Sequence, residues 1–261
     1  MAFTVHAVMP GAWHIVDCMG VCMTLLEGEN AAMLVDTGYG IEDVADFMRH
    51  MTDLPLTVFL THNHHDHAMG ARCFPETYML EADMADWRMF TDDKMRRRVL
   101  TQAIGKNLPV DEKTFLAGEI PLPKVMKPGV IDLGGLTAEI IEAPGHTPGS
   151  AVVYVPERKL LLSGDDWNPC TWLFFPQALG LREYRSNMRG IQQLPFEKVL
   201  CPHREALYDR WMFDDFFNAL TDGNLRAAEP VNIAPYEQID TCQATLPHDQ
   251  VLVFDWAKSG L

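Results

Sequence analysis

The sequence predicts a single domain of mixed helices and strands, in the α/β or α+β class. Two observations predict this class: short apolar runs of β type recur along the chain, and segments with helical spacing lie between them. Neither a composition break nor a Gly/Ser-rich linker divides the 261 residues, so we expect one domain over residues 1–261. A chain of this length can bury a substantial apolar core.

The expected strands lie between polar or Gly-rich turns. Residues 1–16 indicate an initial strand and a turn. The later strands are Ala31–Val35, Leu56–Leu60, Ala138–Ile141, Ala151–Val155, Leu160–Leu162, Val199–Cys201 and Val251–Phe254. Apolar residues dominate each run, as in strands that are buried on at least one face.

Two segments outside these runs show helical spacing. Ile41–Met51 begins with acidic residues and places Val44, Phe47 and Met48 on one face, which is typical of a helix that packs on a core. We expect a second helix over Arg204–Leu220. Its large apolar side chains are expected to pack, and they are Leu207, Trp211, Phe213, Phe216 and Phe217.

Residues 81–118 differ from the rest of the chain, because their pattern is mainly helical and mixed in charge. We expect them to form a helical insertion over one face of the core. The insertion contains the basic run Lys94–Arg98, next to Asp92 and Asp93. A solvated helix with balanced charges is the favoured interpretation, and an anion-binding role is the alternative. In the second case, charge reversal at Arg97 would raise KM for an anionic substrate.

The bulk composition restricts the partners of this chain. The net charge is −15, with 21 Lys and Arg against 36 Asp and Glu, and such a surface repels nucleic acid. Apolar runs such as Leu160–Leu162 and Trp172–Phe175 are too short to span a membrane, and the N-terminus lacks the pattern of a secretory signal. Six cysteines without a CxxC pair indicate reduced, mostly buried thiols. We therefore expect a cytoplasmic protein with a small-molecule substrate and neither nucleic-acid nor membrane partners, and we leave a homodimer open.

The strongest chemical signal is the segment Thr61–His67, which holds four histidines and one aspartate. Neutral imidazole nitrogens and carboxylate oxygens are the usual ligands of zinc and similar divalent ions. The segment follows the strand Leu56–Leu60 and precedes Ala68–Ala71, which could open a helix. A tight turn from strand to helix can aim alternate residues at one metal ion and the next pair at another. A surface cluster of histidines is the competing interpretation.

The same arrangement recurs after three other expected strands. His146 follows the strand Ala138–Ile141, Asp165 follows Leu160–Leu162, and His203 follows Val199–Cys201. Alone, each of these residues would more often be a structural histidine or a turn aspartate. Together they place ligand-type side chains at the carboxyl ends of four strands, where active sites of mixed α/β proteins gather. The pattern therefore predicts a metal centre.

These residues resemble the motifs of the metallo-β-lactamase superfamily, in particular its glyoxalase II-like and lactonase-like members with binuclear sites. The motifs occur in the family's order over roughly residues 5–205, and they are Asp36-Thr37-Gly38, His62-x-His64-x-Asp66-His67, Gly145-His146-Thr147-Pro148-Gly149-Ser150, Ser163-Gly164-Asp165 and His203. The resemblance implies an α+β fold, a four-layer αββα sandwich with the helical insertion, in which metals lie at one edge between two sheets.

The resemblance also implies a role for each residue. His62, His64 and His146 would bind the first of two divalent metal ions. Asp66, His67 and His203 would bind the second, and Asp165 would bridge both. Asp36 would support the loop or a ligand from behind. Zinc is the first expectation, and iron or manganese stays open because imidazole and carboxylate suit all three metals.

The expected function is a binuclear metal-dependent hydrolase with Asp66 and Asp165 as its catalytic carboxylates. Bound cations lower the pKa of water to about 7, so a metal-bridging hydroxide could attack an ester, thioester or lactone of a small molecule. Typical β-lactamases of the family lack a bridging aspartate at the position of Asp165, which argues against an antibiotic substrate. The alternatives on this scaffold are an iron-dependent oxidoreductase of the persulfide dioxygenase type, a phosphodiesterase and a non-catalytic binding module.

A substrate pocket is expected in the segment after Asp165. Trp167, Trp172 and Phe174 could line an apolar pocket beside the metals, and Asn168 could donate a hydrogen bond to the substrate. The equally weighted alternative is that these aromatic rings pack a helix onto the sheets.

Overall fold

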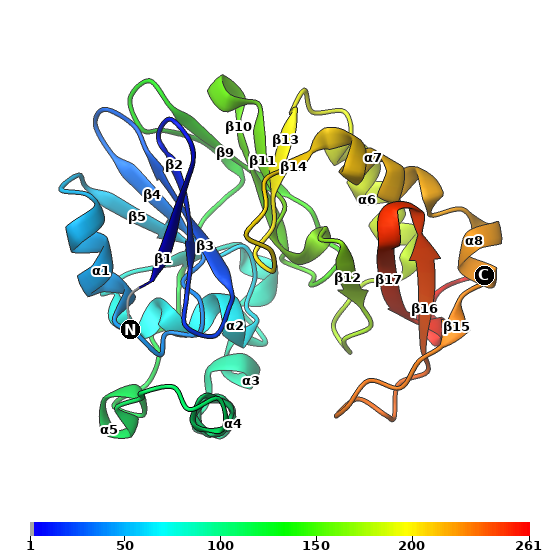
Figure 1. Ribbon diagram of the computed structural model, residues 1–261, viewed down its shortest axis with the longest axis horizontal. Coiled ribbons are helices and arrows are strands. Elements are labelled where there is room, and N and C mark those ends of the chain that lie inside the picture. Colours follow the sequence, from blue (N-terminus) through cyan, green and yellow to red (C-terminus); the bar gives the residue numbers. More distant parts are fainter. Residues whose placement is uncertain (1–2) are drawn as a thin grey trace.

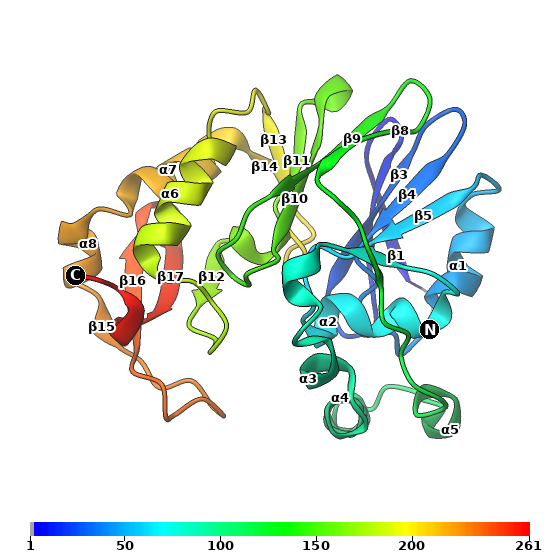
Figure 2. The same cartoon turned by 180° about the vertical axis from the view of Figure 1, so that it is seen from behind.

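The computed structural model describes residues 3–261, which form three sheets and the helices around them (Figures 1 and 2). The first sheet pairs β1 (Thr4–Met9), β2 (Ala12–Val16), β3 (Cys22–Glu27), β4 (Ala32–Val35), β5 (Leu56–Phe59), β6 (Tyr78–Met79) and β7 (Lys124–Val125) in that order. The second sheet pairs β14 (Tyr208–Asp209), β13 (Lys198–Leu200), β11 (Leu160–Leu162), β10 (Ala151–Val155), β9 (Thr137–Glu142) and β8 (Gly129–Asp132). The third sheet pairs β12 (Cys170–Leu173), β17 (Gln250–Asp255), β16 (Thr241–Leu246) and β15 (Glu229–Pro230).

The helices surround these sheets and cover the outer faces of the first two. They are α1 (Val44–Met51), α2 (His65–Ala68), α3 (Trp87–Thr91), α4 (Asp93–Gly105), α5 (Glu112–Phe115), α6 (Leu181–Ile191), α7 (Arg210–Ala219) and α8 (Asp222–Arg226). None of the helices over residues 3–261 has the length and apolar character needed to cross a bilayer.

The first two sheets pack face to face, and each has a helical layer on its other side. Strand β10 shows why: all five of its side chains are buried. Alternate residues of a strand point to opposite faces. Val153 accordingly lies in the core between the two sheets, whereas Val152 lies in the core beneath α6 and α7. On the other side of the molecule, Val44 and Met48 of α1 pack on the outer face of the first sheet. The layers run helix, sheet, sheet, helix, so the expected αββα sandwich is confirmed.

The third sheet extends this sandwich beyond the expectation from sequence. Of its four strands, only β17 was expected. Leu252 and Phe254 of β17 share one buried core with Phe213 of α7, so this sheet closes the far side of the helical layer. In Figure 1 it lies at the right, on the side away from the first sheet. Strand β12 pairs with β17 in parallel, and this pairing holds the segment that follows Asp165.

Two expected helices begin later than their sequence patterns indicate. α1 begins at Val44 because the side chain of Asp43 accepts a hydrogen bond from the Asp46 N–H and caps the helix. α7 begins at Arg210 because residues 208–209 join the second sheet as β14. Trp211, which was expected to pack, is 50% exposed.

Residues 81–118 are mainly helical, as expected for the insertion, and contain α3, α4 and α5. Their basic run does not form one solvated face. Arg97 forms an exposed ion pair with Asp93, 2.8 Å between Nε and Oδ2, in agreement with the solvated-helix interpretation. Arg96 is buried and donates to backbone carbonyls of residues 115–118, which fastens α4 to the end of α5. Arg98 lines the cavity described below.

Candidate metal centre

Four loops meet at one edge of the two large sheets and carry all seven expected metal ligands. They follow β5, β9, β11 and β13. β11 pairs with β13 in parallel, and β9 runs in the same direction because both β9 and β11 are antiparallel to β10. The Ala151 N–H, at the start of β10, donates to Thr61 O over 3.0 Å and ties the loop after β5 to the same edge. Parallel strand direction is therefore what brings residues 62–67, 146, 165 and 203 together.

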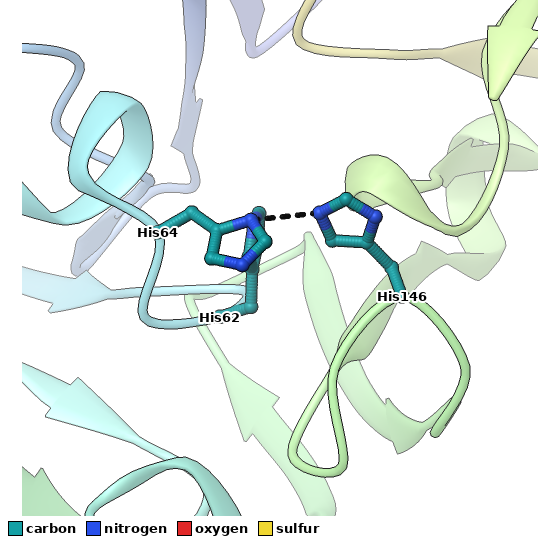
Figure 3. A group of neighbouring side chains, drawn as sticks. All are labelled: His62, His64 and His146. Atoms are coloured by element: carbon teal, nitrogen blue, oxygen red, sulfur yellow. Dashed lines mark hydrogen bonds between the residues drawn. The ribbon is translucent and has the colours of Figure 1, made fainter. Parts of the chain in front are cut away.

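The ligand atoms form three overlapping groups of three. His62, His64 and His146, which we call the first trio, place one atom each within 4.8 Å of one another. Figure 3 shows the rings of His64 and His146 approaching each other from different loops. His64 Nδ1 lies 2.8 Å from His146 Nε2. Asp66, His67 and His203, the second trio, meet the same criterion. These two trios are the sets that the superfamily resemblance assigns to separate metal ions, and the third group, His62, His67 and Asp165, joins them.

Asp165 lies between the two trios. Its Oδ2 is 3.5 Å from His146 Nε2 of the first trio, and 3.5 Å and 3.1 Å from His67 Nε2 and His203 Nε2 of the second. One carboxylate thus reaches histidines of both groups. This is the geometry required of a ligand that two cations share.

Three ligand atoms at this centre are buried without a hydrogen-bond partner among residues 3–261: His62 Nε2, His67 Nε2 and Asp165 Oδ1. An orphaned buried polar atom is costly, and such atoms are rare in folded proteins. Coordination to a cation would satisfy all three. Since imidazole nitrogen and carboxylate oxygen are also the preferred donors of zinc and similar ions, these residues fit a pair of divalent metal ions.

Comparison with known proteins identifies the family of this chain. The sequence of residues 16–203 matches the family model of the metallo-beta-lactamase superfamily. The chain belongs to the metallo-β-lactamase superfamily. A curated relative, the acyl-coenzyme A thioesterase MBLAC2 of Gallus gallus, is 26% identical over 202 residues, covering 69% of this chain and 70% of that protein.

Solved structures of the superfamily share the fold at low sequence identity. TTHA1623 in a di-iron-bound form is 20% identical with a TM-score of 0.53, covering 76% of this chain and 94% of that one. The metallo-β-lactamase FIM-1 from Pseudomonas aeruginosa in its mono-zinc form is 16% identical with a TM-score of 0.58, covering 82% and 92%. Membership of the superfamily, together with the thioesterase relative, supports a metal-dependent hydrolase.

The two trios differ in their electrostatic environment. Burial is the main cause that lowers the pKa of each histidine in the first trio, and the neighbouring imidazoles lower the pKa of His62 and His64 further. Burial also opposes protonation of His67 and His203, but Asp165 and Asp66 outweigh it and raise both pKa values. The first trio therefore holds neutral imidazoles, the form that binds metal, whereas protons compete for the second trio.

Asp36 orients a histidine of the second trio from behind. His67 Nδ1 donates to Asp36 Oδ2 over 3.0 Å, which leaves Nε2 free to face the metal. The backbone N–H of Thr61 donates to Asp36 Oδ1 over 2.7 Å. Asp36 itself adopts a left-handed conformation with φ of 65° at the end of β4, so its side chain turns toward both partners. This is the supporting role that the resemblance implies for Asp36.

Asp166 and the backbone of β12 hold His146. The His146 N–H donates to Asp166 Oδ1 over 2.9 Å, and His146 Nδ1 donates to the carbonyl of Trp172 over 2.7 Å. Asp166 is fully buried, and burial is the main cause that raises its pKa well above the usual value. Asp166 therefore supports the loop that carries His146 from within the core.

Asp83 connects the two loops that carry the first trio, and its role was not foreseen from the sequence. Its side chain is buried and accepts from the Asn63 N–H (3.1 Å), the Thr147 hydroxyl (2.7 Å) and the Gly149 N–H (2.6 Å). Asp83 lies in the insertion, in the acidic stretch Glu81–Asp83, which by pattern is indistinguishable from the surface of a helix.

A cavity of about 460 Å³ opens over the metal centre. Two of the four expected pocket residues line it: Asn168, and Trp172, which is 38% exposed. The remaining lining residues are Tyr39, His64, His65, Asp66, Phe90, Arg98, Gln102, His146, Asp165, Cys170, Phe175, His203, Arg204, Ala234, Pro235 and Tyr236. The walls come from the insertion, the segment around β12 and the loop before β16, so they combine segments far apart in the sequence.

Trp167 and Phe174, also expected in the pocket, lie in the core instead. The Trp167 indole donates to Gln250 Oε1 over 3.2 Å, and its ring packs against Phe213 of α7. Phe174 is fully buried, with its ring stacked on Phe175 at 4.7 Å. β12 ends at Leu173, so strand alternation does not extend to Phe174, which turns into the core while Phe175 lines the cavity.

Proposed function

We propose that this protein is a binuclear metal-dependent hydrolase of small acyl esters, with thioesters as the preferred class ahead of oxygen esters and lactones. The observation that carries the proposal is the position of Asp165 between the two trios, with orphaned ligand atoms on both sides of it. The curated thioesterase relative supports the thioester class. We propose zinc as the metal, because histidine and aspartate donors suit it.

The chemistry that two bound divalent cations supply is a hydroxide nucleophile at neutral pH, since the pKa of bound water falls to about 7. The protein side chains hold and orient the reactants. Asp66 belongs to the second trio and also lines the cavity, so its carboxylate can accept a hydrogen bond from the attacking water. No serine or cysteine nucleophile is required in this scheme.

Tyr39 is the candidate hydrogen-bond donor to the developing oxyanion. It follows the Asp36-Thr37-Gly38 turn and lines the same cavity, with its ring 5.5 Å from the ring of His65. Burial, followed by the charges of Asp66, Asp17 and Asp165, raises the pKa of Tyr39, so the phenol stays protonated at neutral pH. A neutral hydroxyl at this position can donate a hydrogen bond to the oxyanion or to the leaving atom.

The test is a hydrolysis screen of the purified enzyme with its metal content quantified. Thioesters, oxygen esters, lactones and phosphodiesters are compared before and after chelation, with an oxygen-uptake assay in parallel. We expect thioester hydrolysis that chelation abolishes and added zinc restores. Hydrolysis that survives complete metal removal would exclude the proposal, and so would oxygen consumption without hydrolysis.

Substitutions then connect the activity to the centre. We expect Asp165→Asn to lower kcat by roughly 100-fold or more, because the shared ligand loses its charge. His248→Asn is the matched control, since His248 is an exposed histidine outside both trios and the cavity. An Asp165→Asn enzyme with full metal content and full rate would contradict the proposed centre.

A further inference from the structure

We propose that the substrate carries an anionic group, a carboxylate or a phosphate, on one side of its scissile bond and an apolar group on the other. This inference rests on the proposed hydrolase function and specifies its substrate class. The feature that carries it is the mixed lining of the cavity: aromatic rings border the first trio, Arg204 adjoins the second trio, and Arg98 reaches the cavity from α4.

The aromatic side contacts the first trio directly. The rings of Phe90 and Phe175 lie 4.5 Å and 4.8 Å from the ring of His64, and Phe175 lies 5.3 Å from the ring of His146. Tyr236 extends this surface, with its ring 5.4 Å from that of Phe175. A continuous aromatic wall of this kind favours an apolar group, because contact removes apolar surface from water.

The cationic side is formed by Arg98 and Arg204. Arg204 follows His203 of the second trio directly in the chain and also lines the cavity. Arg98 reaches the same cavity from α4 of the insertion. Arg204 therefore lies beside the second trio, whereas the aromatic rings lie beside the first.

Both guanidinium groups are available to a ligand. Among residues 3–261, neither arginine forms a salt bridge, although the chain carries 36 carboxylate side chains and a net charge of −15. Arg204 uses Nη1 to donate to the carbonyl of His203 over 2.8 Å, which fixes its position and leaves its other donors free. Arg97, the neighbour of Arg98, is instead paired with Asp93 and does not line the cavity.

The cavity offers little that would repel an anion. Within the described part of the chain, the carboxylates on its wall are Asp66 and Asp165, and both are expected metal ligands. The side-chain amides of Gln102 and Asn168 add neutral hydrogen-bond donors. Guanidinium groups bind carboxylate and phosphate oxygens in a planar, two-point geometry. A substrate that spans the centre would therefore direct its apolar group to the aromatic wall and its anion to the two arginines.

The experiment compares three thioesters of similar acyl length. Hexanoyl-N-acetylcysteamine is neutral, hexanoyl-coenzyme A places phosphates on the thiol side, and adipoyl-N-acetylcysteamine places a carboxylate on the acyl side. We expect kcat/KM for one anionic probe to exceed that for the neutral probe by about 10- to 100-fold, the value of one or two charge-assisted hydrogen bonds. The preferred probe identifies the anion as phosphate or carboxylate.

The variants assign the preference to the arginines. In Arg98→Gln and Arg204→Gln, the ratio of kcat/KM for the anionic and neutral probes should fall about 10-fold or more, mainly through KM. Arg98→Lys, which keeps the charge, should retain part of the ratio. Arg97→Gln lies one residue away and should keep the ratio of the unaltered enzyme. Equal metal content and circular dichroism spectra establish that each variant is folded.

Binding measurements separate this inference from the proposed function. Calorimetry on the metal-loaded enzyme uses the non-hydrolysable thioether analogues of the same three probes. If none of the thioesters is hydrolysed but an anionic analogue binds more tightly in an Arg98-dependent way, the anion selectivity stands and the hydrolase function fails. If hydrolysis is efficient but the neutral probe is used equally well, or the preference survives both substitutions to Gln, the selectivity is refuted and the hydrolase function stands.

Discussion

Asp83→Ala should destabilise the protein although Asp83 does not touch the expected metal ions. The substitution leaves two buried backbone donors without an acceptor, the Asn63 N–H and the Gly149 N–H, whereas the Thr147 hydroxyl can still donate to Ser150 Oγ, 2.9 Å away. Each orphaned donor costs roughly 1–3 kcal/mol, which sums to roughly 2–6 kcal/mol. Burial opposes ionisation of Asp83 and raises its pKa, so removal of the carboxylate recovers part of this cost. We therefore expect the free energy of unfolding to fall by about 2–4 kcal/mol.

Urea denaturation of the metal-loaded protein measures this loss, and Glu81→Ala is the control because Glu81 is an exposed carboxylate in the same short helix. Because the loop after β5 and the loop after β9 both depend on Asp83, metal affinity should also fall by about 10- to 100-fold. Equilibrium dialysis with metal analysis measures that change. A loss of stability below about 1 kcal/mol with unchanged metal affinity would refute the reasoning, because it would show that the two loops hold their positions without this carboxylate.

Further predictions concern the pH dependence of metal binding, the pocket and the hydrogen bond from Tyr39. The histidines of the second trio have raised pKa values, and those of the first trio have lowered values. On acidification protons should therefore displace metal from the second trio at a higher pH than from the first, and metal content measured over an acid titration should fall in two steps. Trp172→Ala should raise KM with little change in stability, because this ring lines the cavity. Trp167→Ala should lower the free energy of unfolding by about 3–5 kcal/mol, because this ring is buried in the core. Equal effects of the two substitutions on KM and on stability would contradict these assignments. Tyr39→Phe should lower kcat by roughly 100-fold while metal content and KM stay similar, because the oxyanion loses a hydrogen bond. An unchanged kcat would exclude this role for Tyr39.

Positions in the pocket were predicted less well than those of the ligands, and Trp167 and Trp172 show the reason. Both are tryptophans in one short segment after Asp165, and composition does not distinguish them. In the structure Trp172 lies on β12 with its ring toward the cavity, whereas Trp167 precedes the strand and points under α7. The direction of each ring depends on the pairing of β12 with β17, and β17 lies about 80 residues after β12 in the sequence.

The same limit applies to Arg98 and Asp83. From the sequence we predicted a helical insertion with a basic run, and we chose Arg97 as the residue that would test anion binding. In the structure Arg97 is instead paired with Asp93 in solvent. Which of three neighbouring arginines faces the cavity depends on the rotation of α4 about its axis. That rotation is set by burial of residues such as Val99 and Leu100 against the rest of the insertion core.

By itself, the sequence determined the superfamily, the αββα sandwich and the seven residues expected at the metal centre. It could do so because each ligand directly follows an apolar strand, and both strand periodicity and motif spacing are local properties of the chain. The tertiary structure alone decided which side chains surround that centre: Asp83 behind the ligand loops, and Arg98, Arg204, Phe90 and Phe175 on the cavity wall. These positions depend on how the insertion and the third sheet pack against the sandwich, and packing between distant segments leaves no periodic signal in the sequence.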